Sequence, residues 1–296
     1  MKQSARWTIR VFVAAVGIFL IASALTKPAI TPAYYSHFDR YPLVIAHADD
    51  TGSGVAPGNT LLFLETVAEI GVDVLEMDVH MSADGQIVLI HDDTVDRTTT
   101  GTGAVSGLTL AQLQALEVGV NWTADEGATY PYRGQGLTIP TLAAVFERFP
   151  DYPINIEIKA ADPAIAPVLC QTITDHAMTD KVLVVSSRDD ALKAFRKECP
   201  DVASGANRGD VTTFVLLNFV GASGIIPPPY QAFQVPEVSG RIPVVTSSFV
   251  RAAHRANVQV HVWTINDTAE MQRFLDMGVD GIMTDKPAEM LALIGR

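Results

Sequence analysis

The sequence predicts an irregular (β/α)8 barrel of the TIM type, a single α/β domain spanning residues 40–296. Beyond residue 40, short runs rich in valine, isoleucine and leucine alternate about eight times with longer segments of helical periodicity. No glycine-rich dinucleotide fingerprint opens any of the helical segments, which disfavours a doubly wound sheet. The 296 residues fit one such barrel, which often runs to about 250 residues, plus a short extension.

The individual elements follow from periodicity and from the residues at their ends. The predicted strands are 44–48, 74–80, 87–91, 154–159, 182–187, 202–207, 259–265 and 281–285, with a weaker candidate at 232–237. The predicted helices are 60–70, 108–116, 142–149, 163–176, 189–197, 248–256, 269–277 and 287–294. Thr109 with Gln112 resembles a capping box, and Gly71 and Gly278 lie where helices should end. A long loop is expected at 118–136 and an irregular stretch at Pro227-Pro228-Pro229.

The barrel is irregular because no helix separates the second and third predicted strands. These two runs flank Asp84-Gly85, a residue pair typical of a close two-residue hairpin turn. Such a turn would set Asp78 opposite His91. The two runs are therefore expected to form a hairpin that brings an acidic residue and a histidine together.

Residues 1–30 are expected to be a membrane anchor or a signal peptide and not part of the barrel. The run 11–25 is apolar and uncharged, and three basic residues precede it: Lys2, Arg6 and Arg10. The Ala-Ser-Ala at 22–24 fits a cleavage site, so a cleaved signal and an uncleaved anchor are both open. Either one places the barrel outside the cytoplasm, membrane-anchored or secreted.

Composition disfavours nucleic acid as a partner and leaves two alternatives for the state of the two cysteines. The formal net charge of −12 disfavours nucleic acid as a partner, because its phosphates would be repelled. Cys170 and Cys199 have neither zinc-like spacing nor a Cys-x-x-Cys pattern. They are expected to form either a disulfide or a pair of buried free thiols.

The second predicted strand carries three polar side chains at the strand period of two. Glu76, Asp78 and His80 share one face, and apolar residues occupy the other. Two carboxylates are costly to bury without a cation, so this pattern favours a metal site with a neighbouring acid or base. A solvated strand face is the alternative interpretation.

Polar residues also recur at the carboxyl ends of other predicted strands, where barrel enzymes carry their chemistry. This set comprises His47, Glu157, Lys159, Trp263, Asn266 and Asp285. Barrel interiors otherwise prefer branched apolar side chains, so the set as a whole indicates an active site.

These residues resemble those of the glycerophosphodiester phosphodiesterases, over the whole chain from residue 43. The resemblance rests on the ordered motifs Ile45-Ala46-His47, Pro57-x-Asn59-Thr60, Leu75-Glu76-x-Asp78-Val79, Asp84-Gly85, His91-Asp92, Asp96-Arg97-Thr98-Thr99, Glu157-Ile158-Lys159, Trp263-Thr264-x-Asn266 and Thr284-Asp285-Lys286-Pro287. The stretch 149–155 looks closest to the branch that hydrolyses lysophospholipids, and an N-terminal membrane segment would suit access to lipid.

The resemblance implies an enzyme that hydrolyses glycerophosphodiesters to an alcohol and glycerol 3-phosphate. It implies one divalent cation, Mg²⁺ or Ca²⁺, held by Glu76, Asp78 and Glu157. It implies His47 and His91 as the acid/base pair, and Lys159, Trp263 and Asn59 as substrate-binding residues. The substrate would be a glycerophosphodiester or a lysophospholipid.

Two departures from the family pattern widen the range of functions. The family usually has Arg-Gly after its first histidine, where this chain has Ala48-Asp49, and Glu before its asparagine, where this chain has Gly58. Another cation, for example Arg97 or Arg133, could reach the phosphate instead. Otherwise the substrate is a non-standard phosphodiester, as for a lysophospholipase D, or the protein is a weakly active extracytoplasmic binding protein. Restoring Arg and Glu together is expected to strengthen phosphate binding.

Overall fold

The computed structural model describes residue 17, residues 28–219, residue 223 and residues 228–296. The expected N-terminal segment at 11–25 and the first proline of the triplet therefore lie outside the described residues. Among the helices within the described ranges, none is long and apolar enough to cross a bilayer.

Eight parallel strands form the barrel. They are β1 (Leu43–Ala46), β2 (Val74–Met81), β4 (Ile154–Ile158), β5 (Val182–Val185), β6 (Ala203–Ser204), β7 (Ala232–Pro236), β10 (Gln259–Trp263) and β11 (Gly281–Thr284), in the order β6-β5-β4-β2-β1-β11-β10-β7. The two end strands meet where Gly205 bridges Ala232 in parallel and the Ala206 N–H donates to the Ala232 carbonyl at 2.7 Å. This ring confirms the predicted TIM barrel.

The third predicted strand is not a barrel strand. β3 (Ile87–Leu89) pairs antiparallel with β2 and lies off the ring. The absence of a helix before it is explained, since β2 and β3 form a hairpin and the next barrel strand is β4. The weaker candidate at 232–237 takes the remaining place in the ring as β7.

The predicted register of this hairpin is wrong by one residue. His80 pairs with Val88, and the N–H of Ser82 donates to the carbonyl of Gln86, so three residues form the turn instead of two. The third of them, Gly85, has φ of +80°, a conformation that suits a three-residue hairpin loop. Asp78 therefore does not lie opposite His91, because the slip moves every partner by one position.

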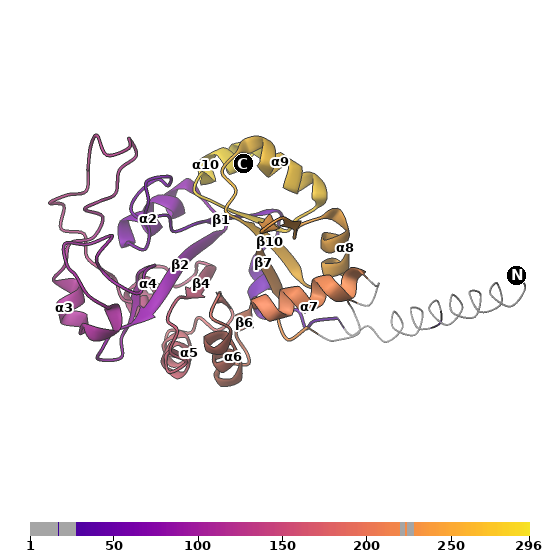
Figure 1. Cartoon of the computed structure of the whole chain (residues 1–296), viewed down its shortest axis with the longest axis horizontal. Helices are drawn as coiled ribbons and strands as arrows, with labels where there is room; N and C mark the ends of the chain where they lie inside the picture. Colours follow the sequence, from indigo (N-terminus) through magenta and orange to yellow (C-terminus); the bar gives the residue numbers. More distant parts are fainter. Residues whose placement is uncertain (1–16, 18–27, 220–222, 224–227) are drawn as a thin grey trace, which may run out of the picture.

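The helices surround the strands (Figure 1). They are α2 (Leu61–Ile70), α3 (Leu110–Gln114), α4 (Leu142–Arg148), α5 (Ile165–Asp175), α6 (Asp189–Glu198), α7 (Arg208–Phe219), α8 (Ser247–Arg255), α9 (Thr268–Met277) and α10 (Pro287–Leu293), with 3-10 turns η1 (Ala33–His37) and η2 (Val105–Gly107). A short hairpin is formed by β8 (Val238–Ser239) and β9 (Ile242–Pro243). The predicted caps are confirmed: Thr109 and Gln112 form a capping box, and Gly71 and Gly278 end α2 and α9 at positive φ.

The segment between β3 and α4 makes an excursion with its own small core. It contains η2, α3 and the predicted long loop, in which no helix or strand is assigned. Val88 and Ile90 of the hairpin pack there with Val105, Leu113 and Ile139. In Figure 1 this excursion projects from the side of the barrel beyond β2, so it borders the strand that carries the acidic residues.

The two cysteines are joined. Cys170 on α5 and Cys199, which follows α6, form a disulfide that links two neighbouring outer helices. Of the two alternatives, the disulfide is the one observed. Such bonds are typical of proteins that fold in oxidising compartments.

Beneath the strand ends, the barrel interior contains a small cluster of three polar side chains: Asn155, Gln234 and His261. The Gln234 side-chain nitrogen lies 2.7 Å from Oδ1 of Asn155 and 3.2 Å from Nδ1 of His261. Within the described part of the chain, Nε2 of His261 has no hydrogen-bond partner. Burial lowers the pKa of His261 to about 4, so the imidazole stays neutral in the folded protein near neutral pH.

We expect His261 to make folding stability pH-dependent between pH 6.5 and pH 4. The unfolded chain takes up a proton there and the folded protein does not, so stability is complete above pH 6.5 and falls as the pH is lowered. The loss at pH 4 should be about 3 kcal/mol. Urea unfolding of wild type and His261→Gln at pH 7 and pH 4.5 measures this. An equal pH dependence in both proteins would contradict the assignment.

Candidate active site

Three carboxylates meet at the carboxyl ends of two adjacent strands. β2 and β4 pair in parallel with Asp78 directly beside Glu157, and Glu76 lies two residues earlier on the same face of β2. One carboxylate oxygen from each residue lies within 4.8 Å of the other two. Glu76 and Asp78 are each only 2% exposed, and Glu157 is partly exposed. We call these three residues the carboxylate cage.

Main-chain and side-chain donors fix the cage in place. The N–H of Ala48 donates to Oε2 of Glu76 at 2.7 Å. The side-chain amide of Asn59 donates to Oδ2 of Asp78 at 2.9 Å and accepts the N–H of Asp78 at 2.8 Å. Asn59 adopts a left-handed conformation with φ of 58°, which asparagine tolerates better than most residues. Both ends of the Asn59 amide are therefore used to position Asp78.

The cage has the chemistry of a site for a hard divalent cation. Burial and the negative charge of Asp78 together raise the pKa of Glu76 to about 8, against the opposing effects of His47, the Ala48 N–H and Lys159. Lys159 offsets part of this charge, since its Nζ lies 3.2 Å from Asp78 and 2.9 Å from Glu157. One ammonium does not balance three carboxylates, and oxygen ligands of this type suit Mg²⁺ or Ca²⁺. The three residues therefore fit a bound cation.

His47 lies beside the cage and has its own carboxylate partner. Its Nδ1 is 2.6 Å from Oδ1 of Asp285, and Asn266 donates to the other oxygen of that carboxylate at 2.6 Å. Burial lowers the pKa of His47, but the hydrogen bond to Asp285 and the charge of Glu76 outweigh it and raise the pKa to about 9. His47 is thus held as an imidazolium at neutral pH.

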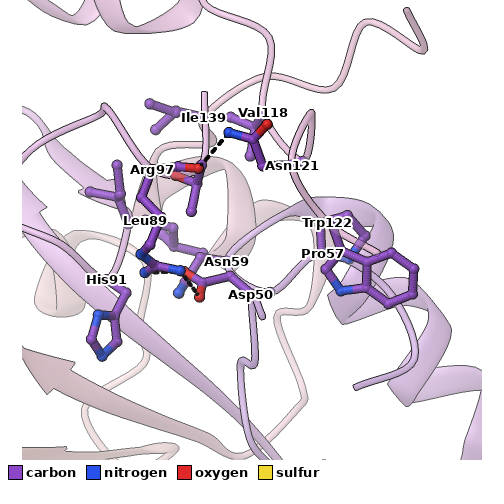
Figure 2. Close-up of a pocket in the computed structure, with 14 residues that line it drawn as sticks. Asp50, Pro57, Asn59, Leu89, His91, Arg97, Val118, Asn121, Trp122 and Ile139 are labelled. Atoms are coloured by element: carbon purple, nitrogen blue, oxygen red, sulfur yellow. Dashed lines mark hydrogen bonds and ion pairs between the residues drawn. The ribbon is translucent and has the colours of Figure 1, made fainter. Parts of the chain in front are cut away.

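His91 lies at the end of the hairpin and belongs to a different network. Its Nδ1 is 2.8 Å from Oδ1 of Asp92, and its side chain is 45% exposed. Arg97 binds Asp92 through Nε at 2.6 Å and Asp50 through Nη1 at 2.5 Å, and Figure 2 shows its guanidinium facing Asp50. The buried His80 lies 3.3 Å from the carbonyl oxygen of His91 and supports its backbone. These contacts hold His91 with Nε2 available.

The structure shows what the two acidic residues after Ala48 contact. The Asp49 carboxylate is buried and accepts hydrogen bonds from the backbone N–H groups of Thr51, Gly52 and Gly54, so it faces its own loop. These donors lower the pKa of Asp49 against the opposing effect of burial. Asp50 forms an ion pair with Arg97, which it shares with Asp92. Asp49 is therefore stabilised by the hydrogen bonds of its own loop, and Asp50 by a shared guanidinium.

Neither of the two arginines considered as substitutes is available to the phosphate. Arg97 is occupied by Asp50 and Asp92 through all three guanidinium nitrogens. Arg133 donates to the carbonyl of Val120 and stacks on Tyr130. Of the three basic residues considered for the phosphate, Lys159 is therefore the one whose positive charge lies at the cage.

Introducing Arg at position 48 and Glu at position 58 is expected to weaken phosphate binding. This is the opposite of the expectation from sequence. A Cβ on Gly58 would lie 2.2 Å from the carbonyl oxygen of Ala48, and Ala48 itself is buried. Ala48→Arg with Gly58→Glu should therefore displace the Ala48 N–H from Glu76, lower the melting temperature and raise KM. Overpacking of this kind costs about 1–3 kcal/mol. The matched control is Gly107→Glu, because a Cβ there meets no atom within 4 Å. A fall in KM for the double variant would contradict this expectation.

Two hollows of different size adjoin the site. The one drawn in Figure 2 is lined by His91, Asn59 and Arg97 and has a volume of about 20 Å³, which is room for about one water molecule. The other has a volume of about 450 Å³ and is lined by Glu157 and Trp263 together with residues of α7, β7 and the β8–β9 hairpin. We call it the α7 groove. Of these two hollows, the α7 groove is the one with the size of a small-molecule site.

The structure thus brings together most of the residues proposed from sequence. Glu76, Asp78 and Glu157 form the cage, Lys159 contacts Asp78 and Glu157, and Asn59 contacts Asp78. Ala48, which binds Glu76 through its N–H, directly follows His47 in the chain. His91 shares the small hollow with Asn59, and Trp263 shares the α7 groove with Glu157. Sequence reasoning assigned no role to Asp285, Asn266 or Asp92, although their positions after strands or within motifs marked them as neighbours of the site.

A parallel barrel with this concentration of polar side chains at its carboxyl ends is the architecture of an enzyme. The chain belongs to the glycerophosphoryl diester phosphodiesterase family, whose model matches residues 51–289. It is therefore a phosphoric diester hydrolase.

Individual relatives agree with this assignment. A glycerophosphodiester phosphodiesterase from Caldanaerobacter subterraneus subsp. tengcongensis is 30% identical over 260 residues, covering 85% of this chain and 97% of the relative. Mouse lysophospholipase D GDPD1 is 25% identical over 260 residues, covering 81% and 82%. An Oleispira antarctica phosphodiesterase, solved with the product sn-glycerol-3-phosphate, shares the fold with a TM-score of 0.68 and 24% identity over 90% of this chain and 100% of that one.

Proposed function

We propose that the protein hydrolyses glycerophosphodiesters to an alcohol and glycerol 3-phosphate with one divalent cation, Mg²⁺ or Ca²⁺, in the carboxylate cage. The observation that carries the proposal is the convergence of Glu76, Asp78 and Glu157 within 4.8 Å beside His47 and Lys159. When bound, the cation would supply positive charge against the phosphate oxygens. Lys159 would add to that charge and help to orient the phosphate.

The two histidines would share the proton transfers. His47 is paired with Asp285 and protonated at neutral pH, so it would donate a proton to the oxygen of the departing alcohol. Asp92 accepts from Nδ1 of His91, which leaves Nε2 to take the proton of the attacking hydroxyl or water. Asp285 and Asp92 would act by orienting the two rings.

The proposed function is tested by identifying the products and by removing the cation. Incubation with glycerophosphocholine should release glycerol 3-phosphate and choline, measured by coupled enzymatic assay. Excess chelator should abolish the release, and adding back Mg²⁺ or Ca²⁺ should restore it. Release of glycerol and phosphocholine would contradict the proposed bond cleavage, and full activity in chelator would contradict the role of the cage.

We also propose that the barrel works outside the cytoplasm, as a membrane-anchored or secreted enzyme. The apolar run 11–25 with its preceding basic residues supports export, and the Cys170–Cys199 disulfide supports an oxidising compartment. Digestion of the barrel by protease added to spheroplasts of a bacterial expression host would test this. Protection until the cells are lysed would contradict it.

A further inference from the structure

The α7 groove is continuous with the carboxylate cage. Glu157 belongs to both, and Ser186, directly after β5, and Gln234, on β7, line the same hollow. A substrate whose phosphate lies at the cage can therefore extend one of its arms into the groove. The groove is not a separate cavity elsewhere in the fold.

The far side of the groove is apolar. Val215, Leu216 and Phe219 of α7 line it, together with Ile242 of the β8–β9 hairpin and Val244, which directly follows β9. Among the lining residues in the described ranges, Arg208 is the single positively charged residue and Glu157 the single negatively charged one. The polar lining residues of the barrel strands and the apolar residues of α7 match a ligand with one polar end and one apolar chain.

Core packing accounts for Val215 and Val244, but it does not account for Leu216, Phe219 and the 60% exposed Ile242. On α7 the inward residue is Phe214, which is buried against Phe233 and Phe249 with ring centroids 4.7 Å and 5.6 Å away. Leu216 and Phe219 of the same helix are 62% and 79% exposed. Exposed apolar residues gathered at one hollow mark a binding site more often than isolated ones do.

We propose that the α7 groove binds one long apolar chain carried by the phosphodiester, as in a lysophospholipid, and so selects acylated over deacylated substrates. This inference rests on the proposed function, because it places the phosphate of the same substrate at the cage. A charged head group is a poorer occupant, since Arg208 and Glu157 are the charged groups that the described part of the chain contributes to the lining. A sugar head group would need more hydrogen-bonding partners than the apolar wall offers.

The inference is tested with a series of lysophosphatidylcholines of increasing chain length, each assayed both below and above its critical micelle concentration. Below that concentration, kcat/KM should already rise by about fourfold for each methylene that enters the groove and then level off. A chain-length effect that appears only above the critical micelle concentration would overturn the inference in favour of contact with a lipid surface. A change of oligomeric state on mutation of the groove would overturn it in favour of a second copy as the occupant.

Two variants locate the effect. Ile242→Ser and Phe219→Ser should each lower kcat/KM for a twelve-carbon chain by about tenfold, and leave that for glycerophosphocholine within about twofold. The matched control is Ile30→Ser, because Ile30 is 84% exposed and does not line the groove. An equal loss on both substrates, or an equal loss in the control, would overturn the inference.

A binding measurement separates this inference from the proposed function. Calorimetry with dodecyl phosphate and with glycerol 3-phosphate, both below aggregation, reports chain binding without turnover. Tighter binding of dodecyl phosphate that Ile242→Ser removes supports the groove, even if no diester is hydrolysed and the proposed function fails. Hydrolysis of glycerophosphocholine without any chain-dependent binding upholds the proposed function and overturns the groove.

Discussion

Replacing Glu76 with glutamine is expected to reduce diester turnover by about 10³-fold while the barrel remains folded. The substitution keeps the shape of the side chain and an oxygen that can accept the N–H of Ala48. It removes one of the three charges proposed to hold the cation, whose contribution to the transition state is several kcal/mol. Initial rates on glycerophosphocholine over a range of cation concentrations measure the loss, which raised cation should partly reverse.

Thermal stability provides an independent measurement on the same variant. Burial raises the pKa of Glu76, so its charge is unfavourable in the cation-free protein, and glutamine should not lower the melting temperature there. Mg²⁺ or Ca²⁺ should raise the melting temperature of the wild type at cation concentrations that leave that of the variant unchanged. Glu147→Gln, an exposed position on α4, is the control. An unchanged response to cation in Glu76→Gln would exclude this residue as a ligand.

The barrel could be predicted because its strands have a strong local signal. A strand buried on both faces reads as a continuous apolar run, as in Leu43–Ala46 and Val182–Val185. β7 gave a weaker signal because Gln234 interrupts its apolar run. The Gln234 side chain points into the barrel, where it contacts Asn155. The role of β3 could not be predicted, because a short apolar run does not reveal whether it pairs in parallel or antiparallel.

α7 was missed for a related reason. Helix prediction from sequence depends on a period that separates an apolar face from a polar one. On α7 the apolar residues point both ways, with Phe214 in the core and Leu216 and Phe219 exposed. The sequence therefore showed no clear period, and the element that forms the groove was absent from the predicted fold. Local rules of this kind are expected to fail where function places residues against the pattern.

The candidate site was predictable to the extent that it depends on strand parity. Glu76 and Asp78 share a face whatever the rest of the fold does, and Glu157 joins them through the parallel pairing of β2 with β4. The hairpin register depends instead on the number of residues in the turn, which is three and not the predicted two. The partners of Asp49 and Asp50 could not be predicted either, because they depend on how the loop folds back on itself.

His47→Ala is expected to lower turnover of alkyl diesters by about 10²–10⁴-fold, the usual contribution of a general acid or base. The size of the loss should depend on the leaving group. An alkoxide needs a proton as it departs, and the imidazolium paired with Asp285 is positioned to supply it. A 4-nitrophenolate leaves without that help. The variant should therefore hydrolyse a glycerophospho-4-nitrophenyl diester at nearly the wild-type rate.

His91→Ala provides the contrast that makes this assignment specific. A base that acts on the nucleophile is needed whatever the leaving group, so this variant should lose activity on both diesters. The double variant should lose less than the product of the two single losses, since residues that act as a unit are not additive. If His47→Ala loses activity equally on both diesters and His91→Ala does so only on the alkyl diester, the two roles are reversed. That reversal would make His91, held by Asp92 and Arg97 at the exposed end of the hairpin, the proton donor to the departing alcohol.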